Sequence, residues 1–172
     1  MSWQPVLDSM LTRWGREVQP DSVWQEYPRP HMTRPEWLNL NGLWKYAITP
    51  QDQDASPDFT GQILVPFAVE SALSGVGKPV GTNSCLWYRR TFTLPDGWAG
   101  RRILLHFEAV DWETAVWVNG RQAGFHQGGY DPFTCDITDA LWPADPQELL
   151  VRVWDPTDDG FQPRGKQVKN PN

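Results

Sequence analysis

RRILLHFEAVDWETAVWVNGRQAGFHQGGYDPFTCD, residues 101–136, is the stretch of sequence that decides the fold. Its centre predicts a β-hairpin. The apolar run 116–118 leads into Asn119-Gly120, and residues 121–126 lead away from it. An Asn-Gly pair readily adopts the two positive φ angles of a type I′ turn, so the two runs are expected to pair as antiparallel strands.

Strands are also predicted on both sides of this hairpin. From Ile103 to Ala109, apolar residues alternate with polar ones, which is the period of a half-buried strand. Beyond the hairpin, Gly128-Gly129 and Asp131-Pro132 interrupt the chain, and residues 133–136 can resume as a strand. We therefore interpret residues 101–136 as an antiparallel meander.

Short alternating segments of the same kind recur along the chain, without a convincing long helix among them. They are expected at residues 44–48, 62–65, 86–94 and 147–154. Roughly eight short strands at regular spacing predict an all-β fold, and specifically an antiparallel β-sandwich of the jelly-roll type.

The composition is that of one folded domain. Apolar residues make up 40% of the 172 residues and aromatic residues 13%, with 11 Trp, which excludes a disordered chain. The net charge of -6 argues against a basic surface that follows phosphates. Nucleic acid is therefore not expected as a partner.

Neither a metal site, a cofactor nor a disulfide framework is predicted. Cys85 and Cys135 are far apart in sequence, and His31, His106 and His126 have no spacing that suits zinc. The N-terminus, MSWQPVLDSM, has no basic segment followed by a long apolar run, and no stretch reaches membrane-spanning length. We therefore expect a soluble, cytoplasmic protein without a membrane partner.

Both ends of the chain are expected to differ from the sandwich, which we place at residues 36–155. Within residues 1–35, apolar residues at helical spacing between 3 and 14 predict a short amphipathic helix. The prolines between 19 and 35 predict an extended strap. Residues 156–172 show no periodic pattern and suit an interdomain linker, so we expect the natural polypeptide to continue.

Six runs of sequence, taken in order, resemble one known family. They are YPRP (27–30), WLNLNGLW (37–44), WYRRTFTLP (87–95), LHFEAV (105–110), VWVNGRQAGFHQGGYDPFTCDIT (116–138) and QPRGKQ (162–167). Their order and spacing resemble the N-terminal sugar-binding domain of glycoside hydrolase family 2, the family of β-galactosidase, β-glucuronidase and β-mannosidase. The resemblance covers nearly all of residues 24–167.

This resemblance implies a galactose-binding-domain-like sandwich, followed by an immunoglobulin-like domain and a TIM barrel that holds two catalytic glutamates. A barrel alone takes roughly 250 residues, so this chain cannot contain the acid and nucleophile of a retaining glycosidase. We expect a non-catalytic domain of a β-galactosidase-like enzyme that contacts both downstream domains and shapes one side of the carbohydrate pocket. The alternative is a free-standing carbohydrate-binding module. Apolar faces that normally meet the next domain also predict self-association into a homo-oligomer.

Candidate carbohydrate-binding residues are first sought among the tryptophans. A partly exposed ring beside polar groups can stack on a pyranose, and Trp87 and Trp112 are the candidates of this kind. Packing in the sandwich or at a domain interface is the more common role of any one Trp, and we assign it to Trp44 and Trp117.

Further candidates follow from the resemblance. The tail would pass near the mouth of the barrel, where long side chains could bind sugar hydroxyls. The candidates there are Gln162, Arg164, Lys166 and Gln167. Some family members place a carboxylate in this crossing; residues 161–172 have none, and Asp158 and Asp159 could substitute. Asn83 matches a loop Asn that touches sugar in family β-galactosidases. Interdomain salt bridges and solvated charge are the alternative for these polar residues.

One pair of acids resembles catalytic carboxylates. Asp111 and Glu113 are separated by a single residue at the entrance to the hairpin. Two acids at such a position usually form a solvated edge rather than a general acid and base. No catalytic residue is therefore predicted in this chain.

Overall fold

The computed structural model describes residues 3–7, 9–53 and 56–156. The described residues form eight strands and no α-helix, which confirms the all-β prediction. The strands are β1 (Gly42–Pro50), β2 (Gly61–Val65), β3 (Ser84–Phe92), β4 (Leu104–Phe107), β5 (Glu113–Val118), β6 (Arg121–Gln127), β7 (Phe133–Asp136) and β8 (Gln147–Trp154). Three 3-10 turns precede β1, namely η1 (Gly15–Glu17), η2 (Pro20–Ser22) and η3 (Pro30–Met32). Two more lie between strands, η4 (Ala72–Ser74) before β3 and η5 (Thr138–Ala140) before β8.

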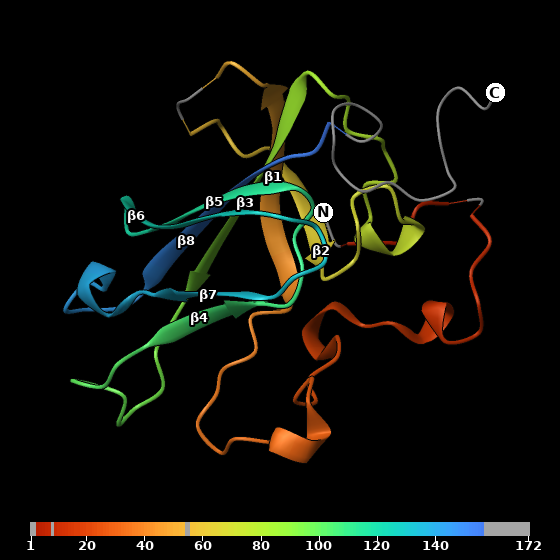
Figure 1. Cartoon of the computed structure of the whole chain (residues 1–172). Coiled ribbons are helices and arrows are strands. Elements are labelled where there is room, and N and C mark those ends of the chain that lie inside the picture. Colours follow the sequence, from red (N-terminus) through yellow and green to blue (C-terminus); the bar gives the residue numbers. More distant parts are fainter. Residues whose placement is uncertain (1–2, 8, 54–55, 157–172) are drawn as a thin grey trace.

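The strands form two antiparallel sheets that face each other as a β-sandwich (Figure 1). The larger sheet has six strands in the order β2-β1-β3-β8-β5-β6, and the smaller one pairs β4 with β7. Along β8, every second side chain is buried, and Leu149, Val151 and Val153 join the core between the sheets. The predicted alternation of this strand is therefore confirmed.

The predicted hairpin forms between β5 and β6, with φ of 51° at Asn119 and 80° at Gly120. The predicted meander is wrong, however, because β4 pairs with β7 in the smaller sheet and not with β5. The chain changes sheet before and after the hairpin. Phe107 and Phe133 stack across the β4–β7 pair with ring centroids 4.7 Å apart. Period-two alternation shows which residues face the core, but it does not identify the neighbouring strand.

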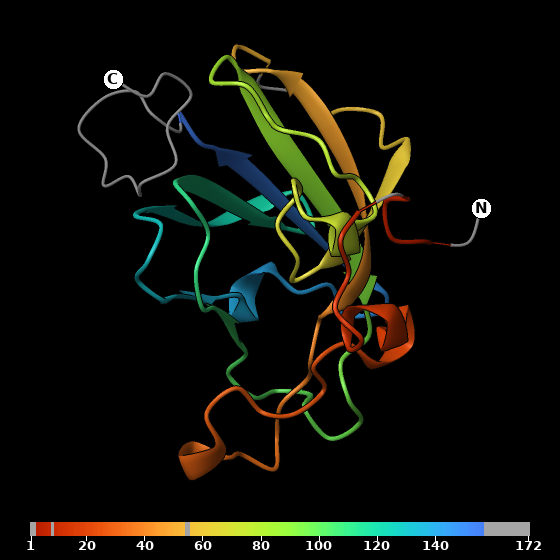
Figure 2. The ribbon, with the colours of Figure 1, turned by 90° about the vertical axis from the view of Figure 1, so that its right-hand side faces the viewer.

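The helix predicted between residues 3 and 14 is not formed by the described residues there. The backbone N–H of Val6 instead donates to the carbonyl of Ala72 at 2.9 Å, and Leu7 and Met10 are exposed. A helix this short is marginal unless its apolar face packs, and here it does not. The strap, residues 19–35, continues along one side of the sandwich and beneath it (Figure 2). The exposed ion pair Arg29–Glu108, at 3.3 Å, links it to the end of β4.

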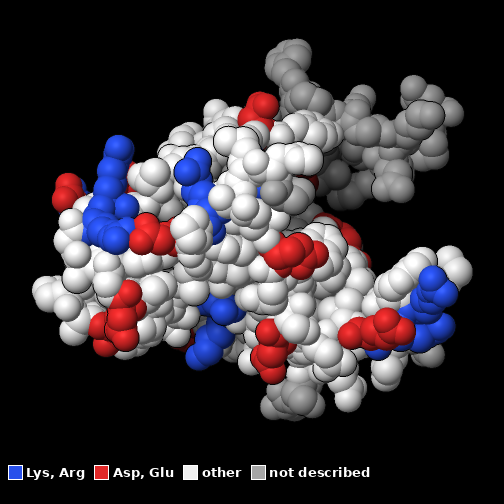
Figure 3. Space-filling view, turned by 90° about the horizontal axis from the view of Figure 1, so that it is seen from below, with Lys and Arg blue, Asp and Glu red and all other residues white. Residues whose placement is uncertain are grey.

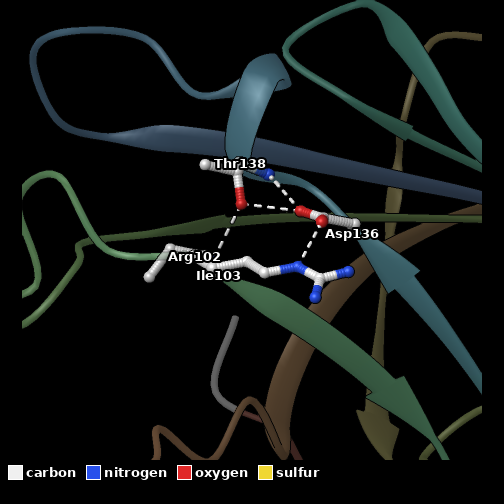
Figure 4. Close-up of polar contacts among 4 residues, drawn as sticks. All are labelled: Arg102, Ile103, Asp136 and Thr138. Carbon is white, nitrogen blue, oxygen red and sulfur yellow. Dashed lines mark hydrogen bonds and ion pairs between the residues drawn. The ribbon is translucent and has the colours of Figure 1, made fainter.

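A cluster of polar contacts holds the smaller sheet to the turn that follows it (Figure 4). Asp136, the last residue of β7, accepts hydrogen bonds from the side chain of Thr138 at 2.6 Å and from Nε of Arg102 at 2.6 Å. The hydroxyl of Thr138 in turn accepts from the backbone N–H of Ile103 at 2.9 Å. These contacts connect the start of β4 to the end of β7.

This cluster predicts a dependence of stability on pH. The hydrogen bonds from Thr138 and then Arg102 lower the pKa of Asp136 from 3.8 to about 2. A depressed carboxyl pKa stabilises the fold above the unfolded pKa, and this stabilisation is lost as the pH falls through about 2. We expect Asp136→Asn to lower the melting temperature at pH 6, with the difference from the unsubstituted protein shrinking towards pH 2. A difference that stays constant between these pH values would contradict this role.

Candidate functional site

One end of the six-stranded sheet gathers several of the candidate residues. Trp154, at the end of β8, pairs with Cys85 at the start of β3 and with Glu113 at the start of β5. The loops before β3 and β5 and the segment after β8 therefore meet at the same end. We call this region the sheet end, and it consists of Asn83, Asp111, Trp112, Trp154 and Asp155.

Asn83 lies in a tight turn whose backbone is well anchored. Its carbonyl accepts a hydrogen bond from the backbone N–H of Gln51 at 2.9 Å, and the carbonyl of Thr82 accepts from Nε1 of Trp154 at 2.7 Å. The side chain of Asn83 is exposed and makes no hydrogen bond within the described residues. Its carboxamide can therefore both donate to and accept from a ligand.

Asp111 and Trp112 are positioned by the two glycines that follow β6. The backbone N–H of Gly128 donates to the carbonyl of Trp112 at 2.9 Å. Gly128 has a φ of 136°, which favours glycine. A Cβ atom on Gly129 would lie 2.4 Å from Oδ1 of Asp111, so a larger residue there would displace this carboxylate. In the sequence these glycines predict an interruption of the strand. In the structure they also contact Asp111 and Trp112 at the sheet end.

The sheet end carries two neighbouring acids. Partial burial of its carboxyl group raises the pKa of Asp111, and the negative charge of Asp155 raises it further. Trp112 beside them is half-buried, as the prediction of a sugar-stacking ring requires. Carboxylates, a carboxamide and an indole are the groups that bind hydroxyls and the apolar face of a sugar. Asp155 was not among the predicted site residues; its only signal in the sequence is that it directly follows the last strand.

Trp87 does not join this group, although the sequence made it a candidate. It is 1% exposed on the outer face of the six-stranded sheet, where it stacks on Trp117 with ring centroids 5.8 Å apart. Its Nε1 donates to Oγ1 of Thr49 at 3.0 Å, and the guanidinium of Arg152 lies 5.9 Å from its ring centroid. The ring therefore has no open face for a sugar. The packing roles assigned to Trp44, which is buried in the core, and to Trp117 are confirmed.

The remaining candidates fall outside the described residues. They are Asp158, Asp159, Gln162, Arg164, Lys166 and Gln167. Within the part of the chain that is described, no cluster of His, Cys, Asp or Glu could hold a metal ion. The same residues form no helix that is long and apolar enough to cross a membrane. On the face shown in Figure 3, basic and acidic side chains alternate over a largely uncharged surface.

Comparison with known proteins gives a family match over most of the chain. A sequence profile described as "Glycosyl hydrolases family 2, sugar binding domain" matches residues 38–161. A β-glucuronidase of Paenibacillus borealis is 27% identical over 133 residues, covering 74% of this chain and 22% of that protein. A β-galactosidase of Thermoanaerobacter pseudethanolicus is 43% identical over 108 residues, covering 60% of this chain and 14% of that protein.

A solved structure has the same fold. The β-glucuronidase of Faecalibacterium prausnitzii matches with a TM-score of 0.60 and 28% identity, covering 80% of this chain and 25% of that chain. This chain therefore spans between 14% and 25% of the length of these three relatives.

Proposed function

Because the chain belongs to the sugar-binding domains of glycosyl hydrolase family 2, we propose that it forms one side of the glycoside pocket in a larger enzyme. The enzyme would hydrolyse β-glucuronides or β-galactosides, with its catalytic glutamates in another domain. In this arrangement the sheet end faces the substrate, and the domain contacts the immunoglobulin-like and barrel domains that follow it.

The exposed carboxamide of Asn83 is the observation that carries this proposal. Its backbone is fixed, while its side chain is free of partners among the described residues. The fixed backbone holds the carboxamide at this end of the sheet, where both its oxygen and its nitrogen can bind a ligand hydroxyl. The carboxylate of Asp111 and the ring of Trp112 stand at the same sheet end as Asn83, so polar and stacking contacts to a sugar can be combined there.

Asn83→Ala tests this role in the complete polypeptide that contains the domain. We expect KM for a nitrophenyl β-glucuronide or β-galactoside to rise about three- to tenfold, because a lost hydrogen bond costs about 0.5–1.5 kcal/mol. Gln62→Ala, which removes an exposed carboxamide from β2, is the matched control and should leave KM unchanged. An unchanged KM in the Asn83 variant would remove the sheet end from the substrate pocket.

A free-standing binding module is distinguished by the 172-residue chain alone. Galactose, glucuronate and mannose would be titrated while tryptophan fluorescence is followed, with calorimetry as a check. If the chain is a supporting domain, we expect no saturable change in fluorescence from sugar binding at the sheet end without the barrel. Saturable binding that Trp112→Ala abolishes would instead favour the module.

A further inference from the structure

A polar cavity lies at the end of the six-stranded sheet opposite the sheet end. Asn83 precedes Ser84, which pairs with Pro50 at the end of β1, whereas the cavity lies beside Gly42 at the start of β1. It has a volume of about 310 Å³ and lies between the strap and the sheet. We call it the strap pocket; the residues that matter below are Asp21, Gln25, Asn41, Gly42 and Arg90. Its volume is at the lower end of the range for small-molecule sites.

Arg90 supplies a donor that the protein does not fully use. Its Nη1 donates to the carbonyl of Leu43 at 3.0 Å, and its guanidinium lies 5.9 Å from the ring centroid of Trp44. Its Nη2 makes no hydrogen bond within the described residues, and none of the ion pairs among them includes Arg90. Burial lowers the pKa of this guanidinium. Because Nε of Arg90 is buried, a ligand in the cavity would reach the guanidinium at Nη2.

The strap approaches Arg90 closely at Gly42. A Cβ atom on Gly42 would lie 3.2 Å from the carbonyl oxygen of Pro20 and 3.3 Å from Nη1 of Arg90. Gly42 also has a φ of 122°, so another residue would be strained there. The glycine therefore lets the strap form one wall of the pocket.

The other polar groups of the strap pocket are mainly acceptors. The carboxylate of Asp21 has no hydrogen bond or ion pair within the described residues. The amide nitrogens of Gln25 and Asn41 donate to backbone carbonyls at 3.3 and 3.4 Å, which leaves both side-chain oxygens without a partner among those residues. The negative charge of Asp21 would repel an anion, and the positive charge of Arg90 would repel a cation. A hydroxyl group, which donates and accepts, suits both.

The backbone of Trp24 adjoins these groups, whereas its ring packs edge-on against Phe67 with ring centroids 5.6 Å apart. Trp24 is 59% exposed, and its φ of 43° is unusual for a bulky residue. Its carbonyl accepts hydrogen bonds from the side chains of Asn39 at 2.7 Å and Asn41 at 3.4 Å. Backbone strain of this kind persists only where the surroundings hold it and is concentrated at ligand sites. The same side chains that line the pocket thus hold Trp24 in place.

We propose that the strap pocket binds a neutral sugar or polyol of monosaccharide size, as a second carbohydrate site separate from the sheet end. Hydroxyl groups of the ligand accept from Nη2 of Arg90 and donate to the oxygens of Asp21, Gln25 and Asn41. This site is formed within the chain itself and does not require another domain.

Nuclear magnetic resonance of the ¹⁵N-labelled chain tests this proposal, because the Nε–H of Arg90 gives its own signal. D-glucose, D-galactose, D-mannose and glycerol would be titrated separately. We expect at least one of them to shift the Arg90 Nε–H and Asn41 side-chain signals saturably, with a millimolar Kd. Gln25→Ala and Asp21→Asn each change an exposed strap residue outside the core, and each should weaken binding about fivefold or more.

Asn83→Ala is the control that separates this site from the proposed substrate pocket, and it should leave the Kd unchanged. Unchanged backbone spectra of the strap variants would show that they remain folded. The proposal is overturned if no sugar or polyol shifts the Arg90 signal, if the shifts map to the sheet end, or if sodium acetate or sulfate saturates the Arg90 signal while the sugars do not.

Discussion

Replacement of Trp87 by alanine is expected to lower the free energy of unfolding by about 3–5 kcal/mol, as for other large buried aromatic residues. Trp87 is 1% exposed, so its removal leaves a cavity beside the ring of Trp117. It also leaves Oγ1 of Thr49 without the hydrogen bond from the indole. Both losses act in the folded state, where neighbouring side chains can only partly fill the space.

Denaturant unfolding of the 172-residue chain measures this effect. Trp142→Ala is the control, because Trp142 is 52% exposed and an exposed substitution usually changes stability by less than about 0.5 kcal/mol. Trp87→Phe keeps a ring against Trp117 but loses the bond to Thr49, so its cost should be intermediate. If Trp87→Ala cost no more than the control, Trp87 would not be the packed residue that the structure shows.

Gln147→Leu is expected to lower the free energy of unfolding by about 2–4 kcal/mol, because several buried polar groups lose their partner. Gln147 is 1% exposed at the start of β8. Its Oε1 accepts from Nδ2 of Asn119 at 2.6 Å and from the backbone N–H of Trp142 at 2.8 Å. Its Nε2 donates to the carbonyl of Ala144 at 3.2 Å and to Oδ1 of Asp145 at 3.1 Å.

Thermal and denaturant unfolding would be compared with those of Gln122→Leu, which makes the same change at an exposed position on β6. The double variant with Asn119→Gly adds a second test. Because Asn119 and Gln147 share a hydrogen bond, the two losses should sum to more than the loss in the double variant. Strict additivity, or a Gln147 variant as stable as the Gln122 control, would rule out this network as a source of stability.

The local signals in the sequence predicted most of the fold. The Asn119-Gly120 turn and the alternation of β8 depend on neighbouring residues only, and both are confirmed. The pairing of β4 with β7 and the unpacked apolar face near Leu7 depend on contacts across the molecule. Such contacts leave no periodic pattern, and the predictions that required them, the meander and the helix, are wrong.

The candidate site was likewise predictable only where residue type or family resemblance was enough, and not where it depends on contacts across the molecule. Trp112 could be selected by residue type and Asn83 by the family resemblance, and the strand register places both at the sheet end. Trp87 belongs to the same residue type but lies in the middle of the sheet, which composition cannot reveal. Asp155 and the guanidinium of Arg90 in the strap pocket were missed because their significance depends on what surrounds them in space. The predicted role of the tail residues stays a prediction.

The position of β8 has a consequence for how the domain is made. It is the last strand of the described residues, yet it lies between β3 and β5 in the middle of the six-stranded sheet. During synthesis, the strands β2-β1-β3 and β5-β6 therefore emerge from the ribosome before β8. Until β8 follows, they are two separate parts of the sheet, each with an unpaired edge. Such edges can pair with other chains until they are covered. Only the emergence of β8 joins the halves, so an early stop in translation would leave two fragments of a sheet rather than a smaller domain.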